Sequence, residues 1–115
     1  MTRKTGDITE TAFSTQVEDL LRLGGWLWLH IKPSIMQSGK WASSMNPEGK
    51  GFSDYLIASD PRYRTDHRLF FVELKDRLGK TTPEQDMWRD CIRACGIPWL
   101  LWRPADIEEI MEALR

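Results

Sequence analysis

Three charged residues in the middle of the chain are of the types that hydrolyse phosphodiester bonds. Asp54 closes the stretch GFSD at 51–54, and Glu73 and Lys75 lie in FVELK at 71–75. Two carboxylates held together repel unless one is protonated or a cation binds between them. Such hard oxygen ligands suit Mg²⁺ or Mn²⁺, which keep several waters and are completed by a substrate phosphate. The trio therefore predicts metal-dependent cleavage of a nucleic acid, with Lys75 orienting water or balancing negative charge.

The segments that carry these residues are predicted to be neighbouring strands. Apolar runs at 52–58 and 69–75 are joined by a polar, proline-containing connection, which indicates an antiparallel hairpin. Side chains alternate along a strand, so Glu73 and Lys75 share one face. We expect Asp54 two residues into the partner strand and beside Glu73, after Gly51, which permits close backbone approach.

A first helix, predicted at 9–23, brings a third carboxylate toward this hairpin. Apolar residues recur at helical spacing, Thr9 can cap the helix, and two glycines follow it. At about 100° per residue, Glu10 lies about 35° from the centre of the apolar stripe. Glu10 is therefore expected to point toward the interior or its margin. Glu18 lies about 115° away, which predicts contact with water.

The remaining segments complete a predicted αβββαβα order. The run 26–31 is nearly all apolar and predicts a strand covered on both faces. Residues 33–51 read as a long loop, in which Trp41 is a candidate for contact with a partner. The strand at 97–102 is expected to run parallel to the strand at 69–75. A terminal helix follows, which gives an α/β mixed sheet flanked by helices.

The second predicted helix begins at Thr82 and ends before Gly96. Pro83 suits the first helical position, and Thr82 with Gln85 matches a capping box. Gln85 therefore has two possible roles. It either caps the helix or belongs to the catalytic set, and the sequence favours neither.

Length, charge and cysteine content set the class of protein. The 115 residues fit one domain, and 41% hydrophobic with 29% charged residues is typical of a globular chain. The net charge of −1 gives no general electrostatic signature of a nucleic-acid partner. Cys91 and Cys95, four apart on a helix, do not indicate a disulfide or zinc site. No apolar run suits a membrane span or signal peptide, so we expect a reducing cytoplasm and no membrane partner.

Four motifs in order resemble the PD-(D/E)XK nucleases and, within them, the VRR-NUC (virus-type replication-repair nuclease) group. The resemblance spans nearly the whole chain and rests on Glu10 with its helix, GFSD at 51–54, FVELK at 71–75 and GKTTPEQ at 79–85. Each motif is weak alone, but four in order are specific. The chain departs from the family in carrying bulky Phe52 after the glycine, where smaller or β-branched residues are usual.

The resemblance implies a restriction-endonuclease-like fold and hydrolysis of DNA that depends on Mg²⁺ or Mn²⁺. It implies a catalytic set of Glu10, Asp54, Glu73, Lys75 and Gln85, with metal held by the three carboxylates and the backbone carbonyl of Leu74. Small stand-alone members are phage or bacterial proteins, and some cut branched DNA such as four-way (Holliday) junctions as homodimers. The basic residues that we expect to contact phosphate are Lys40, Lys50, Arg77 and Lys80.

Two other interpretations remain open. The chain could be a non-catalytic DNA-binding or assembly module that retains the nuclease fold. It could also be an unrelated α/β protein in which Glu73 and Lys75 only form a salt bridge. Eight Glu and six Lys give about 0.4 chance occurrences of Glu-x-Lys, so that tripeptide alone is weak.

Overall fold

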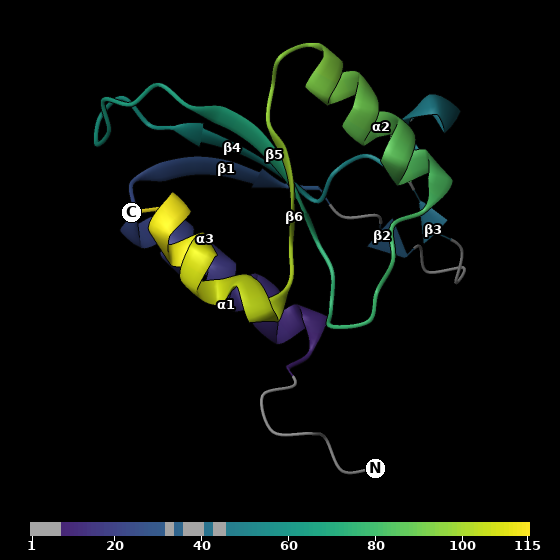
Figure 1. Ribbon diagram of the computed structural model, residues 1–115, viewed down its shortest axis with the longest axis horizontal. Helices are drawn as coiled ribbons and strands as arrows, with labels where there is room; N and C mark the ends of the chain where they lie inside the picture. The colour runs from purple at the N-terminus through teal and green to yellow at the C-terminus, as the bar shows by residue number, and fades with distance from the viewer. Residues whose placement is uncertain (1–7, 32–33, 36–40, 43–45) are drawn as a thin grey trace.

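The computed structural model describes residues 8–31, 34–35, 41–42 and 46–115 (Figure 1). It contains three α-helices in these ranges, α1 (Glu10–Leu23), α2 (Pro83–Ala94) and α3 (Ile107–Ala113). A four-stranded sheet is formed by β1 (Trp26–His30), β4 (Tyr55–Ser59), β5 (Leu69–Leu74) and β6 (Trp99–Trp102). Two-residue strands β2 (Ser34–Ile35) and β3 (Trp41–Ala42) pair with each other, and short 3₁₀ turns lie at Pro47–Gly49 and Pro104–Asp106.

The sheet is mixed, with strand order β1-β4-β5-β6. β4 and β5 form the predicted antiparallel hairpin, with Tyr55 opposite Val72. β5 and β6 are parallel, as expected for two strands joined through a helix. The αβββαβα order is confirmed for the main elements, and the β2–β3 pair is an addition within the segment predicted as a long loop.

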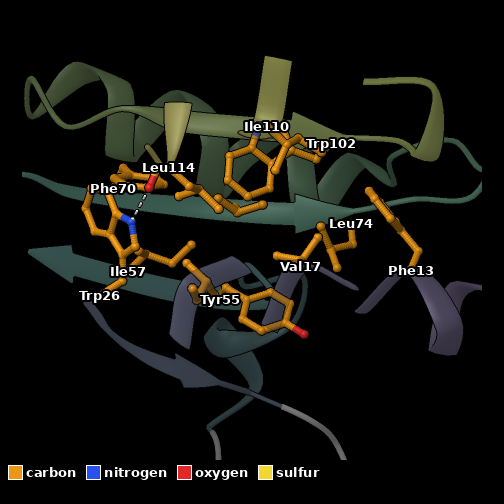
Figure 2. Packing of buried hydrophobic residues seen from close by; sticks show 12 residues of the cluster. Phe13, Val17, Trp26, Tyr55, Ile57, Phe70, Leu74, Trp102, Ile110 and Leu114 are labelled. Atoms are coloured by element: carbon orange, nitrogen blue, oxygen red, sulfur yellow. Dashed lines mark hydrogen bonds between the residues drawn. The ribbon is translucent and has the colours of Figure 1, made fainter. Parts of the chain in front are cut away.

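The hydrophobic core lies between one face of this sheet and helices α1 and α3. Figure 2 shows Phe13 and Val17 of α1 close to Leu74 of β5, and Ile110 of α3 close to Trp102 of β6. Alternate residues of β5 face this core, as the period-2 pattern predicts. The indole of Trp26 donates a hydrogen bond of 3.0 Å to the carbonyl oxygen of Leu114, which ties β1 to the end of α3. These contacts fix α1 against the sheet and so place its first turn.

Helix α2 packs near the opposite face. The ring of Trp88 meets Phe52 edge to face with centroids 4.8 Å apart, and Phe52 meets Phe71 of β5 in the same way at 5.5 Å. The bulky residue at 52 therefore fills the space between sheet and helix. Aromatic pairs of this geometry stabilise by about 0.5–1.5 kcal/mol beyond their buried area.

The prediction that β1 is covered on both faces is wrong. Trp26 is buried, whereas Leu27 and Leu29 are 61% and 56% exposed. β1 is an edge strand of the sheet, with α1 packed near its inner face. Its uniformly apolar sequence does not distinguish a strand covered once from a strand covered twice.

The start of β4 is also later than predicted. The strand begins at Tyr55, three residues after the expected start, because Gly51 adopts a left-handed conformation (φ 85°) and turns the chain. Asp54 therefore stands immediately before the strand instead of two residues inside it. No helix in the described parts of the chain is long and apolar enough to cross a membrane.

Candidate functional site

Asp54 and Glu73 lie in contact where β4 begins and β5 ends. The backbone amide of Asp54 donates a hydrogen bond of 3.2 Å to Oε2 of Glu73. In return, the backbone amide of Leu74 donates one of 2.9 Å to Oδ2 of Asp54. The amide of Ile31, just beyond β1, binds the carbonyl oxygen of Asp54 at 2.7 Å. Each carboxylate is thus held by the backbone next to the other, and the hairpin register fixes the pair.

Lys75 and Gln85 both approach the same oxygen of Glu73. The ammonium nitrogen of Lys75 lies 3.6 Å from Oε1, and the Gln85 side-chain amide donates a hydrogen bond of 2.6 Å to it. Glu73 is only 3% exposed. Asp54, Glu73, Lys75 and Gln85 were predicted from the sequence as site residues. Their side chains form one cluster in the structure.

Gln85 forms the predicted helix cap and also contacts Glu73. Its Oε1 accepts a hydrogen bond of 2.9 Å from the amide of Thr82, while the hydroxyl of Thr82 accepts one from the amide of Gln85. This is the predicted capping box. Because an amide side chain has an acceptor and a donor at its end, the Nε2 group remains to bind Glu73. The cap and the contact with Glu73 use different atoms of one residue.

Gly51 lets the chain pass directly over this helix start. A Cβ atom at residue 51 would lie 2.6 Å from the carbonyl carbon of Glu84 and 2.7 Å from the amide nitrogen of Gln85. The close approach expected of this glycine is confirmed, but it is made with α2. The turn that presents Asp54 is consequently packed on the helix that presents Gln85.

Burial and mutual repulsion disfavour the charged forms of the paired carboxyls. Burial raises the pKa of Asp54, with smaller opposing effects from the Leu74 amide and from His30. Burial and then the charge of Asp54 raise the pKa of Glu73 to about 8, and Lys75 offsets only part of this. A cation between the two carboxyls would relieve the repulsion.

Glu10 lies at the margin of the site. It is exposed, yet it lines a cleft of about 340 Å³ together with Asp54. Partial burial and then the charge of Asp54 raise its pKa, while Lys75 lowers it. The helix angle predicted that Glu10 points toward the interior or its margin, and the structure places Glu10 at the margin.

Sequence reasoning missed a second polar cluster in the same cleft. Glu18 was expected in water, but its side chain is 19% exposed and accepts a hydrogen bond from the hydroxyl of Tyr55. Nδ1 of His30 lies 3.0 Å from the same Glu18 oxygen. The prediction for Glu18 is wrong because the ends of β1 and β4 cover this side of α1. The position of His30 at the end of β1 was the available signal.

Three of the four predicted phosphate-binding residues lie in the described ranges, and all three are exposed. Lys50 is exposed and its ammonium nitrogen lies 3.5 Å from a carboxylate oxygen of Glu84. Arg77 and Lys80 are exposed in the connection between β5 and α2. Lys40 and the side chain of Trp41 lie outside the described residues.

The donor set fits a hard divalent cation that keeps most of its waters. Within the described ranges, no three His, Cys, Asp or Glu side chains are grouped as a complete metal-binding set. Mg²⁺ and Mn²⁺ need no such set, since one or two carboxylates with water and phosphate suffice. Asp54 and Glu73 supply two carboxylates in contact, with raised pKa values that a cation would reverse.

Comparison with known proteins defines the fold. No protein-family profile and no curated protein matches the chain. A solved structure described as a VRR_NUC domain superposes with a TM-score of 0.60, at 19% sequence identity, over 90% of this chain and 94% of that one. The chain therefore has the restriction-endonuclease-like fold of a VRR_NUC domain, as the sequence motifs predicted.

Proposed function

We propose that the protein is a DNA endonuclease that depends on Mg²⁺ or Mn²⁺ and hydrolyses phosphodiester bonds. The observation that carries this proposal is the contact between the buried Glu73 and the half-buried Asp54, with Lys75 beside them. A mere salt bridge between Glu73 and Lys75 would leave no reason to hold a second, half-buried carboxylate against the first. The VRR_NUC fold supports the same reaction class.

In this proposal Asp54 and Glu73 hold the cation, with the carbonyl of Leu74 and with Glu10 at the margin. The cation, when bound, neutralises charge on the phosphate and lowers the pKa of a bound water. Lys75, 3.6 Å from Glu73, donates a hydrogen bond to the attacking water or to the phosphate oxygens. Gln85 fixes the orientation of the Glu73 carboxylate through its bond to Oε1.

We further propose that the substrate is branched DNA, such as a four-way junction, and that the enzyme acts as a homodimer. Cutting two strands symmetrically across a junction requires two sites related by a two-fold axis. The resemblance of the motifs to small VRR-NUC proteins supports both parts. Sedimentation with and without a synthetic junction measures the oligomeric state.

The experiment is cleavage of labelled junction, flap and linear DNA with and without Mg²⁺ or Mn²⁺. We expect metal-dependent cleavage that Asp54→Ala abolishes. Asp90→Ala is the control, because Asp90 is an exposed carboxylate on α2 paired with Arg89. Cleavage that survives Asp54→Ala, or no cleavage of any of the three DNAs, would contradict the proposal.

The same variants separate an enzyme from a binding module that retains the fold. For the enzyme, saturating Mn²⁺ stabilises the wild type by about 2.7 kcal/mol at 100 times its dissociation constant, and Glu73→Gln loses this gain. A binding module predicts no metal-linked stabilisation and DNA affinity unchanged by Glu73→Gln. Thermal unfolding with and without Mn²⁺ distinguishes the two.

A further inference from the structure

The connection between β5 and α2 begins with a bend at 76–79 whose backbone is held by side chains. Oδ1 of Asp76 accepts hydrogen bonds of 3.0 and 2.6 Å from the amides of Leu78 and Gly79. Nη1 of Arg103, the residue after β6, donates bonds of 2.7 and 2.6 Å to the carbonyl oxygens of Asp76 and Gly79. The backbone is therefore fixed on both sides of Leu78, and its side chain is presented from a defined place.

This bend lies against the proposed site. A Cβ atom at residue 79 would lie 3.3 Å from Cδ of Lys75, so the chain crosses the methylene stem of that lysine. The charge of Asp76 contributes, after burial and the charge of Asp54, to the raised pKa of Glu10. In Figure 1 the connection between β5 and α2 passes beside the start of α1. The bend is therefore close both to Lys75 and to the first turn of α1.

Leu78 is a large apolar side chain exposed at this edge of the site. It is 75% exposed, although the backbone on both sides of it is held. Lys80 is exposed as well and is one of the residues expected to contact phosphate. A leucine side chain has no hydrogen-bonding group, so the part of a nucleic acid that it can remove from water is the apolar face of a base. Apolar side chains contact nucleic acids in this way when they enter between base steps.

We propose that Leu78 is a substrate-contacting residue that packs on the face of a base where stacking is interrupted, next to the scissile phosphate. This inference rests on the proposed function in taking DNA as the ligand. It adds a side chain that none of the four sequence motifs contains. A linear duplex offers such a face only at the cost of unstacking a step, whereas a branch point already exposes one. Leu78 therefore contributes to affinity for branched DNA more than to affinity for linear DNA.

The test compares Leu78→Ala with Leu23→Ala. Leu23 is the matched control, because it is 85% exposed at the opposite end of α1 from Glu10. Fluorescence anisotropy measures the Kd for a fluorescein-labelled four-way junction and for a linear duplex of the same sequence, in EDTA and in Ca²⁺. We expect Leu78→Ala to raise the Kd for the junction about 10-fold and the Kd for the duplex less than about 2-fold. Leu23→Ala is expected to leave both unchanged.

Leu78→Met keeps an apolar side chain of similar volume and should retain junction affinity within about 2-fold of the wild type. An unchanged junction Kd in Leu78→Ala that circular dichroism shows to be folded, or an equal rise for junction and duplex, would overturn the base contact. Absence of junction binding by the wild type in both buffers would also overturn it. Selective loss of junction affinity in a protein that cleaves no DNA would uphold the contact while the proposed endonuclease fails. Cleavage with unchanged Kd values would do the reverse.

Discussion

The two ends of strand β4 use aspartate in opposite ways. Asp54, just before the strand, is half-buried beside Glu73, and this partial burial raises its pKa. Asp60, just after the strand, is 6% exposed, but the guanidinium of Arg62 lies 2.8 Å away and lowers its pKa. In the connection beyond it, Arg64 and Ser59 hold the pKa of Asp66 far below its usual range.

This difference distinguishes a structural carboxylate from one suited to bind a cation. At the far end each carboxylate already has its own arginine, so its charge is satisfied in the folded chain. At the site, Lys75 lies 3.6 Å from Glu73 and offsets only part of the repulsion between the Glu73 and Asp54 carboxyls. A buried excess of negative charge persists in a fold only where another cation relieves it or a proton is retained.

Replacing Lys75 should have a large effect on activity. We expect Lys75→Met to lower kcat by about 10²–10⁴-fold, because it removes the group that orients water or stabilises charge. Arg62→Met is the counterpart at the other end of β4 and should leave kcat unchanged. Steady-state cleavage of a junction measures both. Equal losses in the two variants would contradict the distinction between the ends.

The pH dependence of stability should have opposite sign at the two ends. The pKa of Glu73 is raised, so its contribution favours folding below about 4.5 and is lost as pH rises toward about 8. In EDTA, Glu73→Gln should therefore stabilise the protein at pH 8, by on the order of a few kcal/mol, and have little effect near pH 4.

Asp60 is the matched comparison. Because its pKa is lowered, its contribution is present above the usual aspartate range and is lost as pH falls through the lowered value. Asp60→Asn should therefore destabilise at pH 8 and lose this effect in strong acid. Urea unfolding of each variant across pH 3–8 measures both signs. Destabilisation by Glu73→Gln at pH 8 without metal would contradict the repulsion.

Substitutions of Gln85 separate its two functions. Gln85→Ala should cost about 1 kcal/mol of stability through the lost cap and about 10-fold or more in activity through the freed Glu73 carboxylate. Gln85→Glu keeps an acceptor for the Thr82 amide but sets a third carboxylate against Glu73. It should retain the cap while losing activity. Thermal unfolding and cleavage of the same preparations give the comparison.

Lys50 should give the smallest effect. Its ammonium nitrogen lies 3.5 Å from a carboxylate oxygen of Glu84, and this ion pair is on the surface. Lys50→Ala should therefore change the free energy of unfolding by less than about 0.5 kcal/mol. If Lys50 contacts phosphate, the slope of log affinity against log salt should fall by about one. Affinity of a labelled junction at several salt concentrations measures this slope, and an unchanged slope would remove Lys50 from the interface.

Local patterns predicted the elements and the carboxylate hairpin because their causes lie within a few residues. The alternation in β5 places Val72 on the core face of the sheet and Glu73 on the other face. Thr82 and Gln85 form the predicted cap. The contact of Asp54 with Glu73 follows from the hairpin even though the strand begins later than expected.

Predictions failed where burial depends on a distant segment. Glu18 lies far from the apolar stripe of its own helix, and its hydrogen bonds come from His30 at the end of β1 and Tyr55 at the start of β4. The exposure of Leu29 was not predicted, because no periodicity in the strand shows what packs above it. The contact between Gln85 and Glu73 similarly depends on how α2 returns to the sheet.

The contact of Gly51 with α2 has a consequence for how the site opens. Because residue 51 packs on the backbone of Glu84 and Gln85, separation of the helix start from the sheet would also release the turn before Asp54. Fraying of the first turn of α2 and loosening of residues 51–54 should then be one event with one free energy. Native-state hydrogen exchange should show the amides of Asp86 and Phe52, each bonded within its own segment, exchanging through a common opening.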